Sequence, residues 1–137
     1  MNLTISNNHV AKIVAQIREQ WPLEICGYLA GAGGKVLDVH AVKNISASPH
    51  NSFVMEPQSQ LNALVSVQAI KQEILAVYHS HPVRARYDLS EADLAGQVDG
   101  NLLQVVVVPN NQREIESMRV FRIKVGRQIE VPLNIEP

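Results

Sequence analysis

The stretch Ile74-Leu75-Ala76-Val77-Tyr78-His79-Ser80-His81-Pro82 decides the fold and the chemistry of this chain. Its first five residues are apolar and partly β-branched or aromatic, which predicts a buried strand. Side chains two positions apart on a strand share a face, so His79 and His81 can converge on one cation. Pro82 cannot continue a paired central strand, so the chain turns away there. The two histidines are therefore expected at the C-terminal rim of a sheet.

Ser90 and Asp93 follow one short loop later, and their spacing supports two interpretations. A serine followed three residues later by an acid is typical of a capping box that opens a helix. A helix start also aims a carboxylate rigidly, and Asp93 lies within reach of a metal held by His79 and His81. Ser90 is compatible with both roles, because it can cap the helix and donate its hydroxyl to a developing oxyanion. Asp88 is the fallback carboxylate if the helix begins earlier.

Two histidines and one aspartate leave the fourth position of a tetrahedral zinc ion open, which is the arrangement of a catalytic site and predicts a zinc hydrolase. The same ligand set also suits ferrous iron. Hydrolysis needs a further carboxylate as general base. Glu24 is the candidate, because an acid between Pro22 and an apolar run is poorly explained by solubility, although position alone leaves its role open. The remaining acids that we weighed have ordinary surface interpretations: Glu19, Glu56, Glu73 and Glu91.

Composition limits the class of protein. The 137 residues are enough for one domain with one core, and a net charge of -1 without a basic stripe makes nucleic acid an unexpected partner. The sequence shows neither a signal-peptide pattern nor an apolar run of membrane-span length, so we expect a cytoplasmic protein. A single cysteine, Cys26, excludes an internal disulfide and a thiolate cluster and is expected to be a buried filler. Histidine and carboxylate side chains remain as metal ligands.

The pattern along the chain predicts an α/β or α+β domain, a mixed sheet with about three helices packed on it. The predicted strands cover residues 24–30, 36–42, 74–78, 102–108, 118–125 and 128–131, with a turn at Gly31-Ala32-Gly33-Gly34 and a loop over 44–51. The first two predicted helices are one through Val10, Ile13, Val14 and Ile17 that ends near Trp21-Pro22, and one opened by Pro57 with an inner face of Leu61, Leu64, Val65 and Gln68.

Four motifs together resemble the JAMM, or MPN+, metalloproteases over nearly the whole chain. They are Pro22-x-Glu24-x-Cys26-Gly27-Tyr28-Leu29-x-Gly31, Phe53-x-x-x-Pro57, Tyr78-His79-Ser80-His81-Pro82 and Ser90-x-x-Asp93. The resemblance implies one JAB/MPN domain over residues 1–137, with a curved sheet between helices similar to that of cytidine deaminases. It also implies a set of roles: one zinc ion per chain held by His79, His81 and Asp93, Glu24 as general base and acid, and Ser90 as oxyanion donor.

The family resemblance also implies a substrate class. Its members hydrolyse peptide or isopeptide bonds next to the C-terminus of ubiquitin-like proteins, and this chain lacks the long insertions with which eukaryotic relatives read ubiquitin chains. It therefore looks like the small prokaryotic type, which processes ubiquitin-like sulfur carriers. The Gly-Gly tail of a carrier could lie extended beside a sheet edge. Arg84 and Arg86 could meet an acidic carrier surface, but exposed arginines more often serve solubility.

The chain departs from the family pattern in one loop. Eight residues, 82–89, separate His81 from Ser90 where the family commonly has seven, and the proline that often precedes the serine is missing. A surface loop absorbs one residue at small cost, so we expect the ligands to be retained. Two alternatives to the carrier peptidase remain open: a metal-binding but weakly active or inactive MPN-type binding module, and a zinc amidase that acts on small-molecule conjugates.

Overall fold

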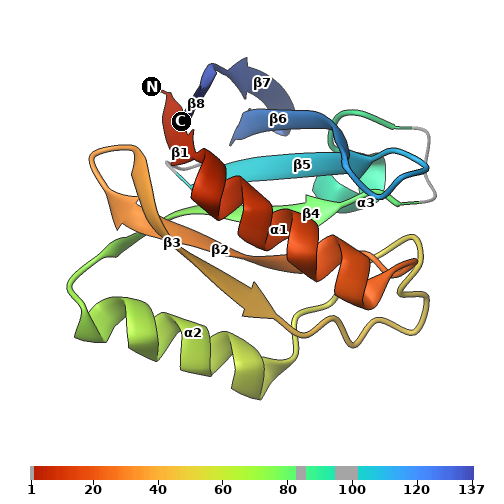
Figure 1. The fold of residues 1–137 in the computed structure, drawn as a ribbon, viewed down its shortest axis with the longest axis horizontal. Helices are drawn as coiled ribbons and strands as arrows, with labels where there is room; N and C mark the ends of the chain where they lie inside the picture. Colours follow the sequence, from red (N-terminus) through yellow and green to blue (C-terminus); the bar gives the residue numbers. More distant parts are fainter. Residues whose placement is uncertain (1, 83–85, 95–101) are drawn as a thin grey trace.

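The computed structural model describes residues 2–82, 86–94 and 102–137, which form one eight-stranded mixed sheet with two long helices and one short one (Figure 1). This confirms the predicted fold class. The sheet order is β7-β6-β5-β4-β2-β3-β1-β8. The strands are β1 (Leu3–Ser6), β2 (Cys26–Ala32), β3 (Lys35–Val42), β4 (Glu73–Ser80), β5 (Leu103–Pro109), β6 (Ile115–Lys124), β7 (Arg127–Val131) and β8 (Leu133–Glu136).

The two long helices, α1 (Asn7–Gln20) and α2 (Pro57–Ala69), pack on opposite faces of the sheet. Ile13 and Ile17 of α1 are buried in the same core cluster as Leu29 of β2. Ala63 of α2 belongs to a separate cluster with Tyr28. Because consecutive residues of a strand point to opposite faces, the two clusters lie on either side of β2. Figure 1 shows β2 and β3 between the two helices.

The prediction for the inner face of α2 is wrong. The helix exists where Pro57 opens it, but its buried residues are Ala63 and Val67. These are small side chains one turn apart, which let the helix backbone lie close to the sheet, and Gln60 Nε2 donates a hydrogen bond of 2.7 Å to the Tyr28 hydroxyl. The residues of the predicted inner face are exposed: Leu61, Leu64, Val65 and Gln68.

Two short strands at the ends of the chain were not predicted from the sequence. β1 and β8 pair in parallel, with Leu3 opposite Leu133, so the two termini lie side by side (Figure 1). Each strand has only four residues, and no local turn links them, so periodicity gives little signal. The predicted boundaries also shift elsewhere: β2 begins at Cys26 rather than residue 24, and β6 covers residues 115–124 rather than 118–125.

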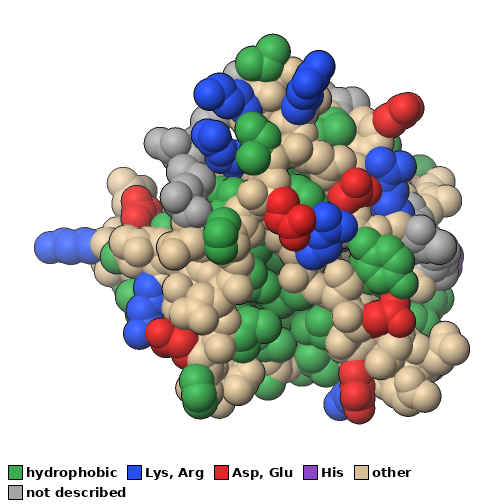
Figure 2. Space-filling view, turned by 90° about the horizontal axis from the view of Figure 1, so that it is seen from above, with side chains coloured by type: hydrophobic (Ala, Val, Ile, Leu, Met, Phe, Trp, Pro, Cys, Tyr) green, Lys and Arg blue, Asp and Glu red, His purple; other side chains and the backbone are tan. Residues whose placement is uncertain are grey.

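The described surface carries mixed charge. Figure 2 shows acidic and basic side chains next to one another near the centre of one face, with apolar side chains around them. Of the helices in the described ranges, none combines the length and the hydropathy that a membrane crossing requires.

The two helix and sheet assignments can be tested by paired substitutions. Leu29 is completely buried, so Leu29→Ala should lower the free energy of unfolding by about 3 kcal/mol through lost contacts and a residual cavity. Leu61 is 54% exposed, so Leu61→Ala should change it by about 0.5 kcal/mol or less. Urea denaturation of both variants measures this difference. Similar losses in the two variants would contradict the orientation of α2.

Candidate metal centre

The end of β4 brings two imidazoles together. His79 is paired in β4, and His81 follows directly; each is 1% exposed. Their Nε2 atoms lie 2.9 Å apart. Strand geometry explains the convergence, since residues i and i+2 share a face. The predicted convergence of the two side chains is therefore present in the structure.

Asp93 completes the group. Its Oδ2 atom lies 3.1 Å from the Nε2 atoms of both His79 and His81, and its side chain is 7% exposed. Burial raises the pKa of this carboxyl, but hydrogen bonds with the two histidines and with the Ser90 N–H lower it more, so the net pKa lies well below its usual range. Asp93 is consequently ionised at neutral pH and offers a carboxylate oxygen.

The spacing of these three atoms suits a tetrahedral metal ion. Ligands about 2.0–2.1 Å from zinc lie about 3.3 Å apart at tetrahedral angles, close to the 2.9–3.1 Å between the three atoms here. The His81 Nδ1 atom lies 2.9 Å from the Arg86 carbonyl oxygen, which requires the proton on Nδ1. In a neutral His81, the lone pair then belongs to Nε2. The donor set therefore fits a divalent cation that prefers nitrogen and oxygen ligands.

Ser90 and Asp93 form the predicted capping box at α3 (Glu91–Leu94). Asp93 N–H donates to Ser90 Oγ at 3.1 Å, and Ser90 N–H donates to Asp93 Oδ2 at 2.9 Å. The second bond uses the same carboxylate oxygen that faces the histidines. Capping and carboxylate positioning are thus one arrangement and not competing interpretations.

In the described part of the preceding loop, the side chains of Arg86 and Asp88 pair with each other. Asp88 Oδ1 accepts a hydrogen bond of 2.9 Å from Arg86 Nε in an exposed ion pair, so the fallback carboxylate points elsewhere. Arg84, expected beside Arg86 on this loop, lies outside the described residues.

Glu24 lies just before β2 and is completely buried. One of its carboxylate oxygens lies within 4.8 Å of the imidazole nitrogens of His79 and His81. The backbone of Glu24 is held by the loop before α2: Glu24 N–H donates to the Pro49 carbonyl at 2.7 Å, and Asn44 Nδ2 donates to the Glu24 carbonyl at 3.0 Å. The structure therefore brings two acids and two histidines that the sequence singled out into one buried cluster: Glu24, His79, His81 and Asp93.

Two supporting residues had no role in the sequence prediction. Ser80 alternates to the opposite face from the histidines, and its Oγ accepts a hydrogen bond of 2.9 Å from Ile25 N–H. Ser80 N–H donates to the Ile25 carbonyl at 3.1 Å, so Ser80 locks the residue after Glu24 beside the histidine strand. Phe53 stacks on the His79 ring at a centroid distance of 4.7 Å. Both residues belong to motifs quoted from the sequence, Ser80 between the two histidines and Phe53 four residues before Pro57, but spacing alone gave neither of them a role of its own.

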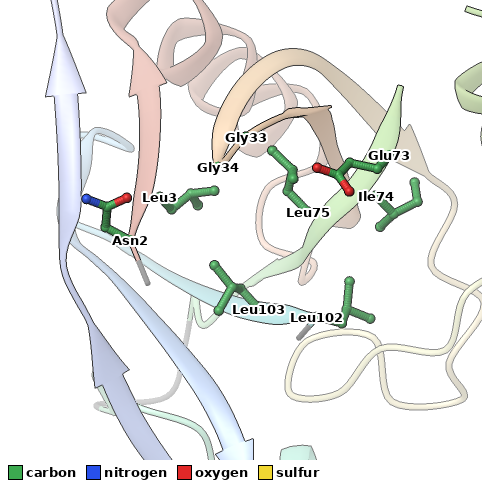
Figure 3. Close-up of a pocket in the computed structure, with 9 residues that line it drawn as sticks. All are labelled: Asn2, Leu3, Gly33, Gly34, Glu73, Ile74, Leu75, Leu102 and Leu103. Carbon is green, nitrogen blue, oxygen red and sulfur yellow. The ribbon is translucent and has the colours of Figure 1, made fainter. Parts of the chain in front are cut away.

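The cluster is distinct from a cavity of about 420 Å³ at the other end of β4. Figure 3 shows that cavity between Leu75 and Leu103, with Glu73 at its edge. Because β4 begins at Glu73 and His79 lies near its other end, roughly 20 Å of strand separates Glu73 from His79. The cavity lining offers one carboxylate and mainly apolar side chains, so it lacks the set of metal-ligating side chains that the histidine cluster has.

Comparison with known families decides the identity of the fold. A family model described as prokaryotic homologs of the JAB domain matches residues 6–123. The chain belongs to this family. The match contains Glu24, His79, His81, Ser90 and Asp93, so the JAMM/MPN resemblance of the motifs is confirmed at the level of the family.

Relatives of this JAB-domain chain include named peptidases. It is 32% identical over 63 residues to a desampylase of Haloferax volcanii, covering 44% of the chain and 45% of that protein. It is 30% identical over 73 residues to a desampylase of Pyrococcus furiosus, covering 53% and 51%. The matches thus span about half of each desampylase. A CysO-cysteine peptidase of Mycobacterium tuberculosis is 26% identical over 135 residues, covering 97% of the chain and 90% of that protein.

Solved structures agree on the JAB fold. A protein of Desulfitobacterium hafniense has a TM-score of 0.84 at 25% identity, and the match covers 98% of this chain and 92% of that protein's chain. A JAB1/MPN domain protein of Archaeoglobus fulgidus has a TM-score of 0.60 at 17% identity and covers 96% and 97%. A structure described as a metalloprotease-like zinc site in the proteasome and signalosome has a TM-score of 0.58 at 16% identity, and the match covers 97% of this chain and 98% of that chain. At this identity the likeness shows the fold alone.

Cys26 is close to the cluster but is not a nucleophile. It is completely buried, its Sγ donates to the Val42 carbonyl at 3.4 Å, and burial followed by the Glu24 charge raises the pKa of its thiol to about 12. The thiolate is the reactive form, so the raised pKa keeps Cys26 in its unreactive thiol form. We expect iodoacetamide to leave Cys26 unmodified in the native protein at pH 8 and to modify it completely in urea. Rapid native labelling, detected by mass spectrometry, would contradict this environment.

Proposed function

We propose that this JAB-domain chain is a zinc-dependent hydrolase of the JAMM type, formed by residues 1–137 as one domain. The observation that carries the proposal is the triangle of His79 Nε2, His81 Nε2 and Asp93 Oδ2 at 2.9–3.1 Å. These three residues would hold the zinc ion and leave one position open for reactants. Bound zinc supplies Lewis acidity, which lowers the pKa of water to about 7 and polarises a carbonyl group.

Glu24 is proposed as the general base and then the general acid. Its carboxylate is buried and within 4.8 Å of the histidine nitrogens, so it can take a proton from the water that attacks the scissile carbonyl carbon. The same proton is then delivered to the leaving amine nitrogen as the C–N bond breaks. One carboxylate thus returns to its starting state after each turnover.

Ser90 is proposed as an oxyanion donor. Its Oγ accepts the Asp93 N–H, and a hydroxyl that accepts one hydrogen bond can still donate its own proton. The capping box fixes the serine relative to the Asp93 carboxylate. Its hydroxyl is therefore suited to stabilise negative charge that develops on the substrate oxygen.

The proposed substrate is a ubiquitin-like sulfur carrier, cleaved at a peptide or isopeptide bond after its C-terminus. The desampylases and the CysO-cysteine peptidase among the relatives support this class. The match to the CysO-cysteine peptidase covers nearly the whole chain, which favours, within this class, a carrier that bears a small amino-acid group over one linked to a second folded protein.

Cleavage of two carrier substrates by the zinc-loaded protein tests the proposal: a Gly-Gly-ended carrier fused to a short peptide, and the same carrier with a C-terminal cysteine. Wild type should cleave at least one, and Glu24→Gln should reduce the rate at least 100-fold while zinc content stays the same, because the neutral amide cannot accept the proton. Mass spectrometry of the products measures the rate.

Glu19→Gln is the matched control, because Glu19 is exposed on α1 and the same charge is removed. It should retain the wild-type rate. Unchanged cleavage in Glu24→Gln would reject the role of Glu24. A zinc-loaded wild type that binds carriers without cleaving them would favour the binding module, and cleavage confined to free small-molecule conjugates would favour the amidase.

A further inference from the structure

The residue just before Ser90, Leu89, is held on both sides of its backbone by one side chain of a distant strand. Leu89 N–H donates to Gln128 Oε1 at 2.8 Å, and Gln128 Nε2 donates to the Leu89 carbonyl at 3.0 Å. Gln128 belongs to β7, where it pairs with Ile123 of β6. The side-chain amide of Gln128 thus binds both polar groups of the Leu89 backbone, as a neighbouring strand would.

One of these bonds acts on the peptide unit that reaches Asp93. The Leu89 carbonyl and the Ser90 N–H belong to the same planar peptide unit and point in opposite directions. Gln128 Nε2 holds the carbonyl end of this unit, and the N–H end donates to Asp93 Oδ2 at 2.9 Å. Rotation of the unit would therefore break both contacts together.

We propose that Gln128 is a positioning residue of the metal centre. Its amide orients the Leu89–Ser90 peptide, and this peptide directs the Asp93 carboxylate toward the histidines. A hydrogen bond to the carbonyl also polarises the peptide and strengthens its N–H as a donor. This inference rests on the proposed function, because the carboxylate matters as a ligand of the zinc ion.

Burial of the Leu89 side chain complements the amide contacts. Leu89 is 1% exposed and packs in a cluster with Val106, Val108, Phe121 and Ile123. Apolar packing is non-directional, so it anchors the side chain and does not select the orientation of the flanking peptides. The directional bonds from Gln128 supply that selection.

The described residues just before Ser90 are held to the sheet at more than one point. The Gln128 amide binds the Leu89 backbone from β7. A second contact, from Arg119 Nη1 to the Tyr87 carbonyl at 3.3 Å, ties the loop to β6 as well.

Glutamine is chemically specific here. Alanine removes both bonds, whereas glutamate keeps the acceptor for Leu89 N–H but replaces the donor with an oxygen that faces the Leu89 carbonyl and Asp88 Oδ2, now 3.0 and 3.3 Å from Nε2. Gln128→Glu is therefore a variant of nearly unchanged size that keeps the bond from Leu89 N–H and loses the two bonds donated by Nε2, to the Leu89 carbonyl and to Asp88 Oδ2. Gln112→Ala, in an exposed turn of the same sheet, is the control for loss of a glutamine side chain.

Two readouts on the full chain test the proposal. In the metal-free protein, amide hydrogen exchange measured by NMR should be at least tenfold faster at Ser90 in Gln128→Ala and Gln128→Glu than in wild type and Gln112→Ala. Exchange at Val105 in the core strand β5 serves as the reference for global stability. In competition with a chelator, the zinc affinity of both Gln128 variants should fall at least tenfold.

Each outcome decides the proposal. Ser90 exchange that rises only in step with Val105, or zinc affinity within twofold of wild type, would reduce Gln128 to a general structural role and overturn the inference. A wild-type chain that binds no zinc would contradict the proposed function instead. The exchange rates at Ser90 would then decide by themselves whether Gln128 orients the peptide.

Discussion

The pairing of β2 with β4 is the constraint on which the metal centre depends. It places Cys26 opposite His79, and the reciprocal hydrogen bonds between Ile25 and Ser80 extend the pairing by one step. Glu24 precedes this pair, so a register shift of one residue would turn its side chain and those of the histidines to opposite faces. Proximity of the carboxylate to the imidazoles therefore depends on strand register, and the contacts of the Glu24 backbone with Pro49 and Asn44 support it.

The cluster concentrates polar groups where water is excluded. Glu24, His79 and His81 are 0–1% exposed, and burial of ionised or polar groups costs free energy unless they are paired or bind a cation. The arrangement in this chain directs a carboxylate and two imidazole nitrogens toward one point. A divalent cation bound at that point would offset the cost, and its binding would then stabilise the folded state.

Sequence reasoning predicted the parts of the structure that are governed by local spacing. The i, i+2 histidines, the capping box of Ser90 and Asp93, and the strands and helices with clear periodicity all lie where expected. Contacts between distant segments were not predictable in the same way. The prediction assigned the larger apolar side chains of α2 to its inner face, whereas the helix packs on the sheet through the smaller Ala63 and Val67. The pairing of β1 with β8 has no local signal in the sequence. The contact between Gln128 and Leu89 spans 39 positions and becomes visible only in the folded chain.

Metal analysis of the purified protein tests the central claim most directly. After dialysis against a weak chelator, the account predicts about one zinc ion per wild-type chain and loss of that zinc in Asp93→Ala, with the variant still folded by circular dichroism. Absence of zinc from the intact wild type under zinc-replete conditions, or full retention in Asp93→Ala, would contradict a centre built from His79, His81 and Asp93.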